Sequence, residues 1–281
     1  MILFKTTATL QHYLNKLRNK SLTIGFVPTM GALHEGHLSL IKESRKTCNI
    51  TVCSIFVNPT QFNDKKDFEK YPVTIENDIF LLETNNTNIL FLPSVNEIYP
   101  GGINKLQHFD IGYLENIQEG KYRPGHFQGV CNVVFRLLEI VNPNTLFLGR
   151  KDYQQYLILK KMMQQFYSTV NVQAVDIARE SNGLAMSSRN MRLSNSAREK
   201  AAILNKALHF IQQNLSVRSV DELVQKAKDS ILENGFDEIN YIEVCDAETL
   251  LPVTNETKHK QLIALAAAFI EEVRLIDNIM L

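Results

Sequence analysis

The chain has 281 residues, of which 44% are hydrophobic and 21% are charged. This composition is typical of a globular protein and excludes a disordered chain, and the length predicts about two domains. Lysine plus arginine and aspartate plus glutamate both number 30, so the zero net charge gives no general attraction to nucleic acid or to an anionic membrane.

Targeting and redox features favour a cytoplasmic protein. The sequence begins MILFKTTATL, without the basic start and long apolar stretch of a signal peptide, and no apolar run approaches the roughly 20 residues of a membrane span. Cys48, Cys53, Cys131 and Cys245 have no spacing typical of a zinc site or a disulfide framework. We therefore expect small buried thiols and a cytoplasmic protein with no membrane or nucleic-acid partner.

The first two thirds of the chain alternate short apolar runs with amphipathic stretches, which predicts a parallel sheet with helical crossovers. We expect strands at residues 22–27, 50–57, 88–92, 145–148 and 172–177, and helices at residues 37–46, 74–82, 129–141 and 153–166. The helix at 153–166, which carries Met162 and Met163, is expected to serve the core. The predicted fold class is α/β, with a Rossmann-like parallel-sheet domain that binds a nucleotide.

The C-terminal third has a different sequence pattern, in which helices come before strands. An apolar stripe from Leu204 to Leu215 indicates one helix, and Ser219 with Glu222 forms a capping box that begins another, which Gly235 ends. Strand-like runs follow at residues 239–245, 262–270 and 273–276. This order predicts a small α+β domain.

The boundary between the two domains is expected in the polar, glycine-containing stretch 177–193, which suits a hinge. We therefore place the Rossmann-like domain at residues 1–177 and the α+β domain at residues 178–281. In this arrangement the second domain would act as a lid on the first.

The segment with the clearest chemistry follows the first expected strand and reads Pro28-Thr-Met-Gly-Ala-Leu-His34-Glu-Gly-His37. A helix that begins at the carboxyl end of a parallel strand presents N–H groups and a positive dipole end, which together bind anions. Two imidazoles beside such a site can hydrogen-bond phosphate oxygens without a permanent charge. A metal-binding histidine pair is the alternative, and the lack of a GxxxxGK[ST] motif excludes a P-loop. We expect a phosphate-binding turn and a helix that starts near His37.

The HxGH signature resembles the nucleotidyltransferase superfamily, and the longer string PTMGALHEGHLSLI resembles the pantoate–β-alanine ligases. Further blocks occur in that family's order: IFVNPTQF (55–62), RPGHFQGV (123–130), GRKDYQQ (149–155), GLAMSSRN (183–190) and RLIDN (274–278). The resemblance covers essentially the whole chain. It implies an ATP-dependent condensation of (R)-pantoate with β-alanine, which gives pantothenate, AMP and pyrophosphate through pantoyl adenylate.

The resemblance also implies roles for individual residues. Those implied in catalysis are His34, His37, Lys151, Ser187, Ser188 and Arg189. Those implied in ATP binding are Met30, Gly31, Ala32, Leu33, His34, Glu35, Gly36, His37, Gly149, Arg150, Lys151, Asp152, Ala178, Met186, Ser187, Ser188 and Arg189. Those implied in pantoate binding are Pro28, Met30, Gln61, Phe62, Val130 and Gln155, and Gln61 is also implied in β-alanine binding. Glu119 and Arg123 are expected near the opening used by β-alanine or pyrophosphate.

Two positions depart from the family pattern. Val73 follows Tyr71-Pro72, where many relatives have arginine, and Asn77-Asp78 stands where relatives have an acidic pair thought to lie near magnesium. Because Mg²⁺ is commonly held by one or two carboxylates plus phosphates, Asp78 is the expected metal ligand. The family further implies ATP as substrate, Mg²⁺ as its companion ion, and a homodimer.

Two alternatives stay open at this point. Another HxGH enzyme that transfers a nucleotide would share the histidine loop, although Gln61 and Gln155 favour pantoate. A non-catalytic nucleotide-binding protein would be expected to lack the histidines or Lys151, and this chain keeps both. Pyrophosphate release from ATP, measured with and without pantoate, distinguishes the three.

Overall fold

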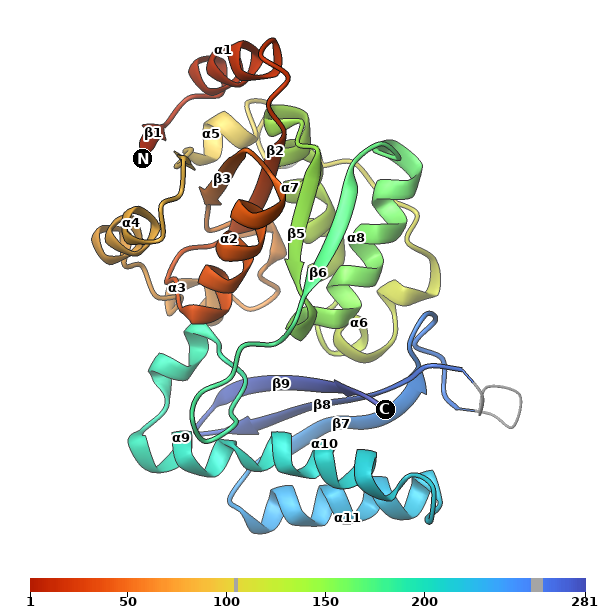
Figure 1. The fold of residues 1–281 in the computed structure, drawn as a ribbon. Coiled ribbons are helices and arrows are strands. Elements are labelled where there is room, and N and C mark those ends of the chain that lie inside the picture. The colour runs from red at the N-terminus through yellow and green to blue at the C-terminus, as the bar shows by residue number, and fades with distance from the viewer. Residues whose placement is uncertain (104–105, 254–259) are drawn as a thin grey trace. The chain divides into compact units, whose positions relative to one another are not determined.

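The computed structural model describes residues 1–103, 106–253 and 260–281 (Figure 1). The chain forms two compact units. The first contains Met1–Arg150 and Gln155–Asp176, and the second contains Lys151–Gln154 and Ile177–Leu281. Five residues that the sequence places in the 1–177 domain, Lys151–Gln154 and Ile177, therefore belong to the second unit.

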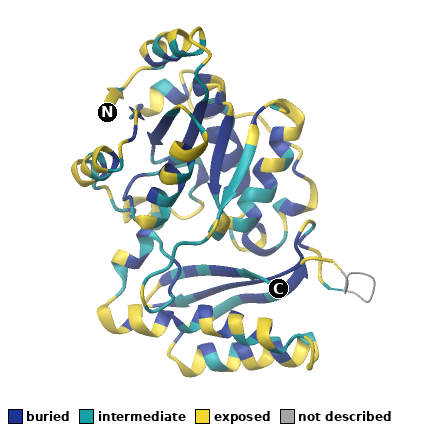
Figure 2. Cartoon of the chain, viewed as in Figure 1, coloured by how far each residue is buried: buried dark blue, intermediate teal, exposed yellow. Residues whose placement is uncertain are grey.

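The first unit is built on a six-stranded sheet in the order β1-β4-β3-β2-β5-β6, and all of its paired strands are parallel. The strands are β1 (Ile2–Phe4), β2 (Ile24–Thr29), β3 (Ile50–Ile55), β4 (Ile89–Phe91), β5 (Thr145–Gly149) and β6 (Asn171–Val175). The central strands are buried (Figure 2), as near-continuous apolar runs in a parallel sheet require. The predicted α/β class is confirmed.

Helices connect these strands. They are α1 (Thr7–Arg18), α2 (Glu35–Thr47), α3 (Lys65–Glu69), α4 (Ile75–Thr84), α5 (Val95–Ile98), α6 (Gln118–Tyr122), α7 (His126–Val141) and α8 (Tyr153–Phe166), with short 3₁₀ turns η1 (Pro59–Gln61), η2 (Gly112–Glu115) and η3 (Arg150–Asp152). Met162 and Met163 on α8 are buried, which confirms their expected place in the core. Among the described residues, no helix is both long and apolar enough to cross a bilayer.

Several elements differ from the sequence prediction. The sequence missed β1 and α1, because Ile2 and Leu3 are exposed and α1 buries only Leu10 and Leu14, which leaves a weak apolar stripe. The structure ends β3 at Ile55 and β6 at Val175, so both expected strands were too long. The helix expected at His37 begins at Glu35, and α7 begins at His126 rather than at residue 129.

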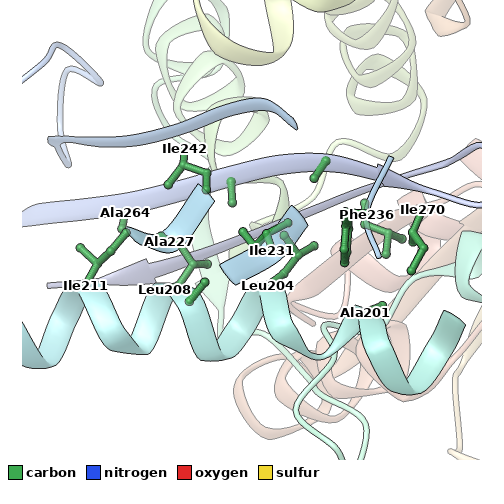
Figure 3. Close-up of a cluster of buried hydrophobic side chains, with 14 of the residues drawn as sticks. Ala201, Leu204, Leu208, Ile211, Ala227, Ile231, Phe236, Ile242, Ala264 and Ile270 are labelled. Carbon is green, nitrogen blue, oxygen red and sulfur yellow. The ribbon is translucent and has the colours of Figure 1, made fainter. Parts of the chain in front are cut away.

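The second unit pairs helices with an antiparallel sheet in the order β7-β8-β9. Its elements are η4 (Ser188–Arg192), α9 (Asn195–Ala201), α10 (Ile203–Asn214), α11 (Val220–Glu233), β7 (Glu238–Asp246), β8 (Leu262–Ile270) and β9 (Val273–Met280). Residues such as Leu208, Ile231 and Ile242 form the apolar core between helices and sheet (Figure 3). Ser219 caps α11 by accepting from the backbone N–H of Glu222, which confirms half of the predicted capping box. The Glu222 carboxylate pairs with Arg218 and Lys226.

The expected hinge contains ordered structure that belongs to the second unit. Arg179 and Ala185 form an antiparallel bridge, and the backbone N–H of Met186 donates to the carbonyl of Ala178 at 2.9 Å. Leu184 and Ala185 are buried. Residues 178–186 therefore form a small hairpin whose polar composition resembles that of a linker. Whether this segment acts as a lid stays a prediction.

Candidate active site

The loops of the first unit that carry predicted site residues all begin at one edge of its sheet. Strands β3, β2 and β5 are neighbours, and Pro28 and Thr29 at the end of β2 pair with Ser54 and Ile55 at the end of β3. Because the strands are parallel, the histidine loop, the turn at 58–61 and the segment after Gly149 follow the same carboxyl edge. Ligands of open α/β sheets bind at such an edge.

The two histidines hold the start of α2 through reciprocal hydrogen bonds. His34 is the N-cap residue, and its Nδ1 accepts from the backbone N–H of Gly36 at 3.1 Å. Nδ1 of His37 accepts from the backbone N–H of His34 at 3.3 Å. Since an accepting nitrogen carries no proton, this pattern assigns the proton of each neutral ring to Nε2. Both rings thus have an Nε2–H donor beside a helix N-terminus, where a negative charge is favoured.

A buried carboxylate fixes the turn before His34. Asp78, on α4, has no exposed surface, and its Oδ2 and Oδ1 accept from the backbone N–H groups of Ala32 (2.9 Å) and Leu33 (2.8 Å). The Thr74 hydroxyl donates a further hydrogen bond to Oδ1 at 3.0 Å. Hydrogen bonds to a charged acceptor are stronger than those between neutral groups. Asp78 therefore holds the backbone that leads directly into His34.

The same turn explains the glycine in the PTMGALHEGH string. Gly31 and Ala32 have left-handed backbone conformations, with φ of 81° and 48°. A Cβ on Gly31 would lie 3.0 Å from both Asp78 Oδ2 and Ile55 Cγ2. The turn therefore needs a residue without a side chain at position 31.

This geometry does not fit the expected role of Asp78 as a magnesium ligand. Both carboxylate oxygens face protein donors, and the side chain is fully buried. Within residues 1–103, 106–253 and 260–281, no three or more His, Cys, Asp or Glu side chains are grouped to hold a metal ion. These hydrogen bonds assign Asp78 a role in ordering the loop. Its predicted role as a metal ligand, which this geometry does not favour, stays a prediction.

Asn58 is the buried centre of the turn after β3. Its Oδ1 accepts from the backbone N–H and the hydroxyl of Thr60, at 3.3 and 3.0 Å, and from the Tyr99 hydroxyl at 3.0 Å. Its Nδ2 donates to the Gly129 carbonyl at 3.1 Å and to Gln61 Oε1 at 3.2 Å. Asn58 thus orients the side chain of the predicted pantoate ligand Gln61.

The backbone of Gln61 is held by a chain of buried polar groups. Its carbonyl lies 2.7 Å from Nδ1 of His126, and Nε2 of His126 lies 3.1 Å from Arg123 Nη1. Because arginine only donates, His126 accepts at Nε2 and donates its Nδ1–H to Gln61. Arg123 also pairs with the buried Glu119 at 3.8 Å. Glu119 and Arg123 therefore take part in an internal network, and the sequence assigned no role to His126.

Of the residues predicted to form an apolar wall for pantoate, Met30 contacts the Gln61 side chain, and Phe62 follows Gln61 in the chain. Gln61 Nε2 lies 2.9 Å from Met30 Sδ. The Phe62 ring packs edge-on against the rings of Phe68 and Tyr71, with centroids 5.2 and 5.7 Å away. Val130 is buried on α7, next to the glycine that contacts Asn58. Pro28 lies within β2 and Gln155 is half-buried in the first turn of α8.

The other predicted residues, from Lys151 onward, belong to the second unit. Gly149 and Arg150 belong to the first unit, and the Arg150 guanidinium pairs with Asp176 at 2.8 Å. Lys151 is mostly buried, and its Nζ lies 3.9 Å from Asp152. Ser187 caps η4, where its Oγ accepts from the backbone N–H of Arg189 at 3.3 Å. Ser188 is buried, and Ala178 and Met186 are joined by the hairpin hydrogen bond.

A family model described as pantoate-beta-alanine ligase matches residues 2–280. The chain belongs to this family. The order of motifs had predicted this membership, which is now confirmed over almost the whole sequence.

Relatives and solved structures of pantoate–β-alanine ligases agree. Proteins named pantothenate synthetase from Azobacteroides pseudotrichonymphae and Flavobacterium psychrophilum are each 42% identical, and the alignments cover 99% and 100% of both chains, respectively. Pantothenate synthetase from Thermus thermophilus has a TM-score of 0.92 at 37% identity over 99% of each chain. The ligase from Francisella tularensis, complexed with beta-gamma ATP and beta-alanine, has a TM-score of 0.83 at 37% identity, covering 100% of this chain and 97% of that one.

Proposed function

We propose that this chain joins (R)-pantoate to β-alanine with ATP, giving pantothenate, AMP and pyrophosphate through pantoyl adenylate. The pantoate carboxylate attacks the α-phosphorus of ATP and expels pyrophosphate. The amine of β-alanine then attacks the acyl carbon and expels AMP. Membership of the family supports the overall reaction, and the Francisella tularensis relative is complexed with beta-gamma ATP and beta-alanine.

The observation that carries this proposal is the pair of backbone hydrogen bonds to Nδ1 of His34 and His37, which assigns an Nε2–H donor to each ring. Both rings are held by backbone N–H groups on Nδ1, so both donors are uncharged and fixed in direction. Negative charge grows on the phosphate oxygens as the carboxylate attacks. Donors fixed in advance stabilise that developing charge without any reorganisation at the moment of reaction.

The two substrates have separate sets of proposed ligands. Gln61 and Gln155 orient pantoate, because amides bond a carboxylate and hydroxyls without adding charge. Gln61 also borders the β-alanine position. Lys151 and Arg189, with Ser187 and Ser188, hold the triphosphate, since cations and hydroxyls match phosphate oxygens.

We also propose that Mg²⁺ arrives with ATP. Magnesium keeps several waters and binds mainly through substrate phosphates and few carboxylates, and Asp78 is already committed to the histidine loop.

The cytoplasm as compartment and a homodimer as assembly are proposals of the same kind. The family resemblance supports the dimer, and the sequence favours the cytoplasm. Light scattering of the purified protein at several concentrations gives the oligomeric state directly, and a monomer at all of them would contradict the dimer.

The test of the function is isotope exchange. With pantoate, ATP and Mg²⁺ but without β-alanine, labelled pyrophosphate should enter ATP, and this exchange should require pantoate. Exchange that does not require pantoate but requires another nucleotide acceptor would identify a different HxGH transferase. No exchange in protein that makes pantothenate would contradict the free adenylate.

A further inference from the structure

The RLIDN block near the C-terminus has no role among the residues described so far. It lies in β9, an edge strand of the antiparallel sheet, and its last two residues, Asp277 and Asn278, are 3% and 5% exposed. Buried polar side chains are stable only when they have partners. The partners of this pair lie in the two segments of the second unit that carry the proposed triphosphate ligands.

Asn278 holds the first of these segments. Its Nδ2 donates to the backbone carbonyl of Lys151 at 2.9 Å. Two residues further along, the Tyr153 hydroxyl donates to the carbonyl of Ala247 at 3.0 Å, so the segment Lys151–Gln154 is fixed at both ends. A bond to the Lys151 carbonyl restrains the peptide that follows this residue. It therefore restrains the direction in which the lysine side chain leaves the backbone.

Asp277 holds the hairpin at residues 178–186, which leads directly into the second segment. Its two carboxylate oxygens accept from Nη1 and Nη2 of Arg179, at 2.7 and 3.0 Å. Arg179 also donates to the carbonyl of Gly183 at 3.1 Å, across the hairpin that leads into Ser187–Arg189. The backbone N–H of Asn278 donates to Asp277 Oδ1 at 2.8 Å. One short stretch of strand thus holds both segments.

We propose that Asp277 and Asn278 are positioning residues that fix Lys151 relative to the turn at 187–189 and so preorganise the triphosphate site. The inference rests on the proposed function only in assigning these segments to ATP. Neither residue is placed against the nucleotide. Their effect on binding arises because cations that are already ordered lose little conformational freedom when phosphate binds.

The variant that tests this is Asn278→Asp. It keeps the size and shape of the side chain but puts a carboxylate oxygen against the Lys151 carbonyl in place of the N–H donor. ATP affinity, measured by calorimetric titration, should fall by roughly five- to twentyfold, as for the loss of one buried hydrogen bond. Pantoate affinity should stay unchanged. Asn240→Asp is the matched control, since Asn240 lies in the same sheet and bonds Glu238 and Arg274 at 2.9 and 2.7 Å.

A double-mutant cycle separates positioning from a general structural effect. If Asn278 acts through Lys151, Asn278→Asp should weaken ATP binding in the parent protein and have no further effect in Lys151→Ala. Equal weakening in both backgrounds, or parallel loss of pantoate affinity, overturns the proposal. Asn278→Ala removes the donor without adding charge and serves if the aspartate variant does not fold. Because ATP binding is measured without turnover, failure of the ligase reaction itself would be seen separately, in a pantothenate assay of the unmodified protein.

Discussion

At the scale of single residues, the site depends on imidazoles whose protons are placed by the backbone. The N–H groups of Gly36 and His34 occupy Nδ1 of His34 and His37, respectively. A histidine that accepts at Nδ1 must be uncharged or must break that bond to gain a proton. In each ring, Nδ1 therefore has a structural role, and Nε2 has the chemical role that we propose.

Substitutions at His37 separate these two tasks. Glutamine places an amide N–H near the Nε2 position but loses the acceptor at Nδ1, whereas asparagine offers an acceptor near Nδ1 and no donor at Nε2. His37→Ala should lower the adenylation rate by roughly 10²–10³, as for loss of one oxyanion donor. Glutamine should recover part of this loss and asparagine should recover little. Single-turnover adenylation measures both, and a better asparagine variant would show that helix capping dominates.

Gln61 should govern pantoate and leave ATP unaffected. Gln61→Ala removes a side chain that Asn58 already orients, so a bound pantoate would keep unpaired polar groups, at about 1–3 kcal/mol. Separate titrations with pantoate and with ATP measure the two affinities, and Gln155→Ala should behave in the same way. A comparable loss of ATP affinity would show that these residues do not belong to the pantoate subsite alone.

At the scale of elements, helix α4 is connected to the histidine loop through one carboxylate. Asp78 accepts from two consecutive backbone N–H groups and from Thr74. Asp78→Asn leaves one acceptor oxygen for donors that approach both, and turns an amide N–H toward a backbone N–H. We expect a loss of about 1–3 kcal/mol in the free energy of unfolding, and a lower adenylation rate.

Urea unfolding and magnesium titrations of activity check this expectation. Thr74→Val is the milder control, because it removes only the hydroxyl donor and keeps both backbone hydrogen bonds. A stable Asp78→Asn protein that requires far more Mg²⁺ would restore the metal assignment that the geometry argues against.

The close contact between α7 and η1 leads to a second prediction about elements. A Cβ on Gly129 would lie 2.2 Å from the carbonyl oxygen of Thr60, so Gly129→Ala must push the helix away from the turn that carries Gln61. Overpacking of this kind typically costs about 1–3 kcal/mol. Thermal unfolding should show this loss, together with weaker pantoate binding. Gly101→Ala, where a Cβ meets nothing within 4 Å, is the control and should change neither property.

The elements that the sequence predicted well are those with strong periodicity. The amphipathic pattern of α8 and the apolar run of β8 gave bounds that match the structure, while α1, with two buried leucines, left too weak a pattern. The histidine loop could be predicted because its motif is local. The tasks of Asp78 and His126 could not, since each depends on a partner far away in the chain, Leu33 for one and Gln61 for the other.

At the scale of the whole chain, buried thiols make stability depend on alkaline pH. Burial raises the pKa of Cys53, Cys131 and Cys245 from an ordinary 9.0 to about 12. Below pH 9 these thiols keep their protons in both the folded and the unfolded chain, so they contribute no pH dependence. Between pH 9 and 12 only the unfolded chain loses them, which favours unfolding by up to about 1.4 kcal/mol per pH unit and thiol.

We therefore expect the free energy of unfolding to fall as pH rises above 9, and Cys131→Ala to reduce that slope. Urea denaturation at closely spaced pH values, with the half-buried Cys48→Ala as control, measures the difference. The same slope in parent protein and Cys131→Ala would mean that other groups account for alkaline unfolding. Thiol reagents should meanwhile modify Cys48 faster than the three buried cysteines.

The four residues Lys151–Gln154 limit how the C-terminal unit can be exchanged between relatives. They belong to the second unit, although the chain on either side of them belongs to the first. A fragment that begins at Ile177 would lack the carbonyl that Asn278 bonds and the hydroxyl that reaches Ala247. In chimaeras of family members, a single crossover near residue 177 would pair a lysine segment from one parent with a β9 strand from the other. Exchange of the C-terminal unit between relatives should therefore succeed more often when residues 151–154 are exchanged with it.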